Sequence, residues 1–361
     1  MKIMYIWYND NGDNMTRVEG QIKIFEDIKD MYLRNGSITN DDIYKIITEF
    51  GFTDEEKQMR VKKGLFNFKG TVKTRGLISN NEEISFIPFS SNADTSKEEL
   101  ETAVKMYISV DSSSLNYAYR DLNNYLNSNS IKNNSKARNR VTNDDIVIRL
   151  PNFRDVETVR NYIRSNPKLK GSIKKPNPFL PQDDMGICYS MDGRSTSVNN
   201  ELSISLHNFF EKSKNDLNSF NRDNFKKYLH NTKSEFYNKY PTSLFYPESV
   251  RINALIELSM DEDFDFEQMK KYATLIQTTK EDLKRMTIND LIKMTCRDLK
   301  QKYPKSEPLS LIPYIENLKE EDFNSSAMYH LSKVFLTKDI VMDYLLKDMM
   351  NGQNTNNKKF V

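Results

Sequence analysis

The chain has 361 residues, which is enough for two or three domains of about 150 residues each. Its 53 Lys and Arg residues nearly balance its 51 Asp and Glu residues, and the formal charge of +2 argues against a protein that coats nucleic acid through its overall charge. With 20 Phe and 19 Tyr residues, the chain is too aromatic to be disordered. The composition therefore predicts a folded protein whose electrostatic function depends on local clusters of charge.

The cysteines and histidines give no metal or disulfide signature, because Cys188 and Cys296 lie far apart and the three histidines are scattered. We therefore expect neither a metal nor a cofactor. The first residues lack the apolar run of a secretory signal, and no stretch of about 18 apolar residues follows. These features predict a protein of the cytosol, or one delivered to a host cytosol, without a membrane segment.

The first hundred residues mix helical and extended patterns. Apolar spacing predicts a helix around Gln21–Leu33, and a second helix starts at the capping box Thr53–Glu56. Extended segments are predicted at Phe68–Lys73 and Ile84–Phe89. The polar stretch Ser90–Ala103 is typical of a connection between domains.

From Val104 to about Lys214, strands alternate with helices. Strands are predicted at Val104–Val110, Asp145–Leu150 and Gly186–Met191, with helices after Leu115, after Asn152 and from Asn200 to Lys214. We expect the prolines of KKPNPFLPQ to stop the helix that Asn152 begins.

Beyond residue 215 every long segment has helical periodicity, and the predicted helices are Asp223–Tyr240, Pro247–Met260, Phe266–Gln277, Lys280–Tyr303 and Ser326–Met350. The sequence thus predicts an α+β fold in four parts. These are a mixed N-terminal region (1–95), a central α+β domain (96–215), a helical C-terminal region (216–350) and a disordered tail (351–361).

The strand Val104–Val110 has two different faces. Val104, Met106, Ile108 and Val110 lie on one side, while Lys105, Tyr107 and Ser109 lie on the other. This alternation predicts one dry face, and the simplest interpretation of the polar face is that it meets solvent.

Positive charge is concentrated between Lys132 and Lys175, which we call the basic segment. It holds twelve basic and four acidic residues, a local charge of +8. The simpler interpretation is a set of exposed helix faces. The sharper hypothesis is that Lys136, Arg138 and Arg149 converge on one anion, because guanidinium groups bind phosphate oxygens in pairs.

The central domain thus offers a cation-rich set of side chains, in which Arg194 follows the predicted turn Asp192–Gly193. A lysine among other cations loses its proton more readily and can act as a general base, a tyrosine can donate a proton, and arginines can hold a departing phosphate. Together these roles describe a metal-free β-elimination of phosphate. The simpler alternative for Arg194 is an ordinary turn residue.

The VKMYISV strand, the later strand that carries Arg149 and the stretch GICYSMDGRSTSVNNEL resemble the phosphothreonine lyases over about residues 104–210. These are bacterial type III effectors, with relatives in plant pathogens and in the lyase components of lanthipeptide and thioamide peptide synthetases. The resemblance implies Lys105 as the base, Ser109 as a supporting residue, and Arg149 and Arg194 as phosphate ligands. Tyr107 stands where that family has a histidine acid.

Two function classes follow. The first is elimination of phosphate from phosphoserine or phosphothreonine in a peptide or protein, with Lys105 and Tyr107 catalytic and Lys136, Arg138, Arg149 and Arg194 binding phosphate. The alternative is a non-catalytic protein whose basic segment binds nucleic acid or an acidic protein, with the helical C-terminal region as a partner-binding platform. A protein with a fold and function of its own is a third interpretation.

Overall fold

The computed structural model describes residues 7–8, 14–54, 86–91, 95–96, 99–100, 102–111, 113–138, 142–174, 177–191, 196–232 and 248–285. The chain divides into two compact units, Met1–Thr232 with Glu248–Ala273, and Lys233–Pro247 with Thr274–Val361. The elements below belong to the first unit, apart from the part of the final helix that follows Ala273. They form a mixed α+β fold, which confirms the predicted class.

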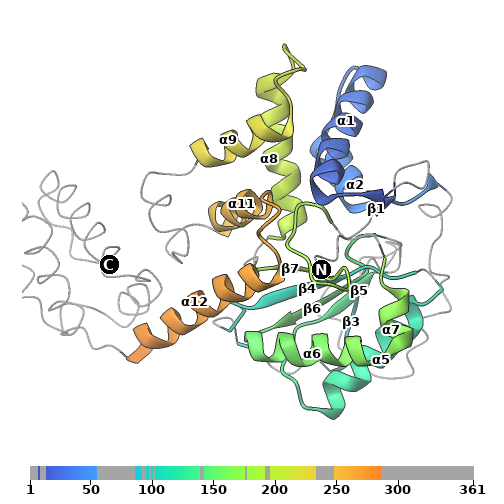
Figure 1. The fold of residues 1–361 in the computed structure, drawn as a ribbon, viewed down its shortest axis with the longest axis vertical. Coiled ribbons are helices and arrows are strands. Elements are labelled where there is room, and N and C mark those ends of the chain that lie inside the picture. Colours follow the sequence, from blue (N-terminus) through green and yellow to red (C-terminus); the bar gives the residue numbers. More distant parts are fainter. Residues whose placement is uncertain are drawn as a thin grey trace, which may run out of the picture. The chain divides into compact units, whose positions relative to one another are not determined.

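A five-stranded antiparallel sheet has the order β3-β5-β6-β4-β7 (Figure 1). Its strands are β3 (Phe86–Pro88), β4 (Val104–Ile108), β5 (Lys136–Arg138), β6 (Ile146–Leu150) and β7 (Cys188–Ser190). A separate two-stranded ribbon pairs β1 (Trp7–Tyr8) with β2 (Asn14–Met15). The strands predicted near residues 84–89, 104–110, 145–150 and 186–191 are confirmed, although β4 ends at Ile108 and Val110 forms only an isolated bridge to Ile173.

One face of the sheet carries the helices α5 (Leu115–Ser128), α6 (Phe153–Ser165) and α7 (Pro167–Ser172) (Figure 1). Asn152 caps α6 by accepting a hydrogen bond of 2.9 Å from the Asp155 amide. The expected stop at the prolines of KKPNPFLPQ is wrong. Helix α6 ends before Pro167, and that proline opens α7, because the first turn of a helix does not need the amide that proline lacks.

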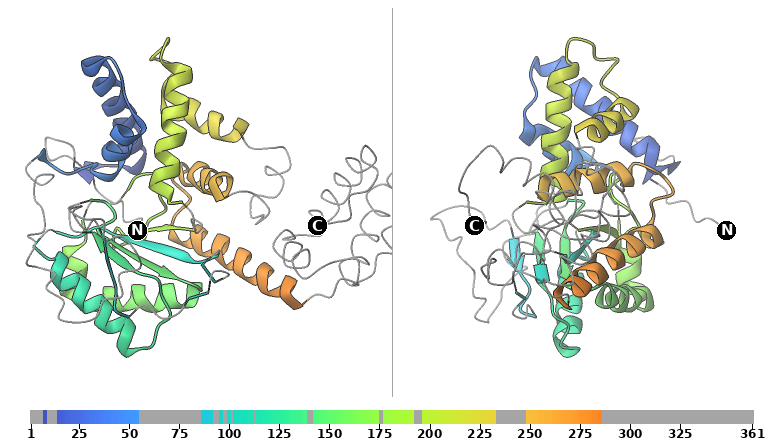
Figure 2. Two further views of the ribbon diagram at one scale, coloured as in Figure 1. Left: turned by 180° about the vertical axis from the view of Figure 1, so that it is seen from behind. Right: turned by 90° about the vertical axis from the view of Figure 1, so that its left-hand side faces the viewer.

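A second group of helices lies on the opposite side of the sheet (Figure 2). Its members are α1 (Arg17–Asn35), α2 (Asn40–Thr48), α8 (Val198–Ser213), α9 (Arg222–Thr232) and α11 (Glu248–Ser259). The sequence did not predict α2. The last described helix, α12 (Phe266–Arg285), is continuous where two helices were predicted. The segments predicted at 68–73 and 326–350, most of the one starting at Thr53, and Cys296 lie outside the described residues.

The core of this second layer joins the helices to the sheet. It is a buried apolar cluster that includes Tyr107, Val147 and Cys188 from three strands together with residues of α1, α2, α8, α9 and α11. Phe25 of α1 packs edge-on against Phe220, with ring centroids 5.0 Å apart. The prediction of a single dry face on the Val104–Val110 strand is therefore wrong, because the side of the sheet that carries Tyr107 is also buried.

Candidate anion site

The strand pairing aligns three polar side chains across the middle of the sheet. Lys105 of β4 is the register partner of Arg149 on β6 and of Ser190 on β7. Residues in register on adjacent antiparallel strands point to the same face, with Cβ atoms about 5 Å apart. Lys105, Arg149 and Ser190 therefore form one row, which we call the Lys105 row.

The Lys105 row is largely withdrawn from solvent. Arg149 is 7 % exposed and Ser190 is fully buried, whereas Lys105 is half-buried. The Arg149 guanidinium donates a 2.7 Å hydrogen bond from Nη2 to the carbonyl of Leu100. Lys105 and Arg149 together give this face two cationic side chains directly opposite each other, an arrangement suited to an anionic group.

Tyr107 lies on the same face as Lys105, one row further along β4. Its register partners are Val147 and Cys188, it is 4 % exposed, and it belongs to the apolar cluster. Burial raises the pKa of the Cys188 thiol well above its usual range, which indicates a dry environment at this row.

Ser109 takes part in a buried network beyond the end of β4. Its hydroxyl donates to the Thr142 carbonyl at 3.1 Å and lies 3.4 Å from the Asp145 carboxylate. It is 1 % exposed. The hydroxyl that the sheet aligns with Lys105 is that of Ser190, which the sequence did not single out because only the β4–β7 register reveals it.

The predicted phosphate ligands separate into two groups. Lys136 is exposed and pairs with Val147, so it lies diagonally next to Arg149 on the same face. Arg138 is aligned with Asp145, four residues from Arg149 along β6, a distance of about 13 Å. The expected convergence of Arg138 with Arg149 is therefore not seen, and Arg194 lies outside the described residues.

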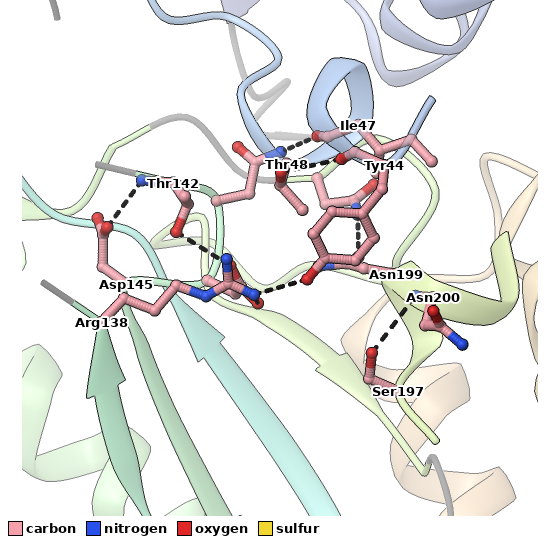
Figure 3. A network of polar contacts seen from close by, with 12 residues as sticks. Tyr44, Ile47, Thr48, Arg138, Thr142, Asp145, Ser197, Asn199 and Asn200 are labelled. Atoms are coloured by element: carbon pink, nitrogen blue, oxygen red, sulfur yellow. Dashed lines mark hydrogen bonds and ion pairs between the residues drawn. The ribbon is translucent and has the colours of Figure 1, made fainter. Parts of the chain in front are cut away.

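Arg138 instead joins the sheet to α2 (Figure 3). It forms a buried ion pair with Asp144 at 3.0 Å and donates to the Tyr44 hydroxyl at 2.6 Å. The neighbouring Asn143 amide donates to the Thr48 carbonyl at 2.8 Å. This arrangement anchors the end of α2 to the β5–β6 connection.

Much of the charge of the basic segment is balanced by carboxylates that lie elsewhere in the sequence. The pairs are Lys132 with Glu99 (2.7 Å), Arg160 with Asp183 (2.8 Å), Arg164 with Asp184, and Lys174 with Asp111 (3.9 Å). The rings of Tyr125 and Tyr162 stack on each other with centroids 3.6 Å apart, so their facing sides are not open to a nucleic-acid base. The segment is therefore less positive in space than its sequence suggests.

No family model, curated protein or solved structure matches this chain. In the part of the chain that the structure describes, no helix is long and apolar enough to cross a bilayer. Within those same ranges, no three His, Cys, Asp or Glu side chains gather as ligands for a metal ion.

Proposed function

We propose that this protein eliminates phosphate from phosphoserine or phosphothreonine in a peptide or protein. The observation that carries the proposal is the position of Lys105 directly opposite Arg149 on a largely buried face of the sheet. This pair supplies a base and a permanent cation within one cross-strand distance. Exposed Lys136, diagonally next to Arg149, adds a second cation for the phosphate.

The chemistry needs no group beyond these side chains and the substrate. The amine of Lys105 takes the proton from Cα, and the electron pair of that C–H bond forms the Cα=Cβ double bond. The Cβ–O bond breaks, and its electrons leave with the phosphate. Arg149 stabilises the negative charge that grows on the phosphate oxygens, because a fixed cation in a desolvated site is most effective where charge develops.

The proposal also implies a location and partners. A phosphorylated peptide or protein is the substrate, and the site of action is the cytosol of the producing cell or of a host. The predicted C-terminal helical region would then contact a partner protein. Nucleic-acid binding receives less support, because ion pairs engage five cations of the basic segment, Lys132, Arg138, Arg160, Arg164 and Lys174.

The test is a reaction of the purified protein with a phosphothreonine peptide. We expect release of inorganic phosphate, which a colorimetric assay measures. The peptide product should be lighter by one phosphoric acid, which mass spectrometry detects. Lys105→Ala should lower the rate by about 10²–10⁴-fold, the usual contribution of a general base.

Lys132→Ala is the matched control, because Lys132 lies on the surface and its ion pair with Glu99 is exposed. This variant should keep the wild-type rate. Absence of phosphate release by the wild type, or equal rates for the wild type and Lys105→Ala, would sink the proposal.

A further inference from the structure

The surroundings of Tyr107 are those of a core residue. Its ring belongs to the apolar cluster that joins the sheet to the second group of helices, and its row partners are Val147 and Cys188. A side chain that donates a proton to a substrate must reach the reacting atoms. Tyr107 is 4 % exposed, so little of its side chain is open to a substrate that approaches from solvent.

The three polar positions of this face differ in exposure. Lys105 is half-buried, Tyr107 is 4 % exposed, and Ser109, just beyond the end of β4, is 1 % exposed, so Lys105 is the most accessible of the three to a substrate. Successive same-face positions on a strand are about 6.7 Å apart. A substrate held between Lys105 and Arg149 therefore lies a full row away from the Tyr107 position.

The described part of the Lys105 row holds an amine, a guanidinium and a hydroxyl, and none of its members is a carboxylic acid or a histidine. Arg149 keeps its proton at all physiological pH values, so it acts through charge and hydrogen bonds. In the proposed reaction the Lys105 amine takes the Cα proton, so it is the member of this row that then holds a proton to return.

We infer that Lys105 carries out both proton transfers of the reaction, taking the Cα proton and returning it to the departing phosphate, and that Tyr107 is a packing residue. This inference rests on the proposed phosphate elimination. The proton moves from Cα to the Lys105 amine, the C–H electron pair becomes the double bond, and the Cβ–O electron pair leaves with the phosphate. The Lys105 ammonium then protonates the phosphate, so the products are the dehydrated residue, hydrogen phosphate and the regenerated amine.

The geometry of the substrate permits one group to serve both steps. Cα and the phosphate-bearing Cβ are bonded neighbours, so the Cα–H and Cβ–O bonds can be placed on the same side, facing one ammonium group. Arg149, opposite Lys105, would hold the phosphate on that side throughout. The elimination would then be syn, with a single base.

The experiment compares Tyr107→Phe and Tyr107→Met with the wild type on a phosphothreonine peptide, with thermal unfolding followed by circular dichroism to identify folded variants. The Phe variant removes only the hydroxyl, and the Met variant keeps apolar volume. We expect kcat within threefold of wild type for whichever variants fold. A folded Tyr107→Phe variant that loses 100-fold or more in kcat, while still binding the peptide, overturns the inference.

A sulfothreonine peptide provides a second measurement, because sulfate leaves without needing a proton. If Tyr107 were the acid, its variants would lose phosphate elimination but keep sulfate elimination, so the ratio of the two rates would change. We expect the same ratio in the wild type and in the folded Tyr107 variants. An inactive wild type refutes the proposed function itself, whereas an active wild type with a changed ratio refutes only the role given to Lys105.

Discussion

Asp145 is an almost fully buried carboxyl group that directly precedes β6. Its carboxylate accepts a hydrogen bond from the Thr142 amide at 2.8 Å (Figure 3). It also accepts one from the Val110 amide at 3.0 Å, and the residue is 1 % exposed. Burial is the largest influence and raises the pKa of Asp145 well above its usual range, against the opposing effect of these amides. Folding therefore favours the protonated acid.

This shift predicts a pH dependence of stability. The folded protein keeps a proton that the unfolded chain releases above about pH 4, so Asp145 lowers the free energy of unfolding by about 1.4 kcal/mol per pH unit until it ionises in the folded state. Asp145→Asn removes this dependence. In urea unfolding at pH 4.5 and pH 7, we expect the variant to gain stability relative to the wild type at the higher pH. A difference that is the same at both pH values would contradict the assignment.

At the scale of single elements, strand β4 shows what the sequence could and could not predict. The alternation of apolar and polar residues predicted the strand, and the same pattern located β6, so Lys105 and Arg149 were recognised before their pairing was known. Their exact opposition depends on register, which connects residues more than forty positions apart. Burial of the polar face depends on helices that precede the sheet in the sequence and on others that follow it, which local periodicity does not encode.

The start of α6 follows directly from local sequence and is open to a direct test. Asn152 accepts from the Asp155 amide, and Asn152→Ala removes this cap from an exposed position. We expect a loss of about 1 kcal/mol in the free energy of unfolding. Asn152→Ser, which keeps an acceptor without placing a second carboxylate beside Asp155, should unfold at nearly the wild-type urea concentration, and an equal loss in both variants would show that the cap contributes nothing.

At the scale of the whole molecule, a charge counted over one stretch of sequence differs from the charge of the surface to which that stretch contributes. The charge of +8 between Lys132 and Lys175 ignores acidic partners such as Glu99, Asp183 and Asp184, which folding brings to the same surface. Arg160 is the most buried of the paired cations outside the sheet. Its partner Asp183 has no exposed side-chain area and also accepts a 2.7 Å hydrogen bond from the Tyr189 hydroxyl.

This difference in burial predicts unequal costs for two substitutions. Arg160→Ala leaves the buried Asp183 carboxylate without its cation and should lower the free energy of unfolding by about 3–5 kcal/mol. Arg164→Ala, which breaks a pair whose two side chains are each 38 % exposed, should cost less than about 1 kcal/mol. Chemical denaturation of both variants at one pH measures the two losses, and equal losses would mean that the pair with Asp183 is screened like a surface pair.

The helices that pack on the Tyr107 face are made at different times during synthesis. Helices α1 and α2 precede β3 in the sequence, whereas α8, α9 and α11 follow β7. On a ribosome that adds about 5–20 residues per second, α8 is made roughly 8–30 s after α2. During that interval the apolar side chains of α1 and α2, Phe25 among them, have no completed core to enter. Newly made chains would therefore depend on chaperones until synthesis passes α11, and shortened chains that end before it should aggregate.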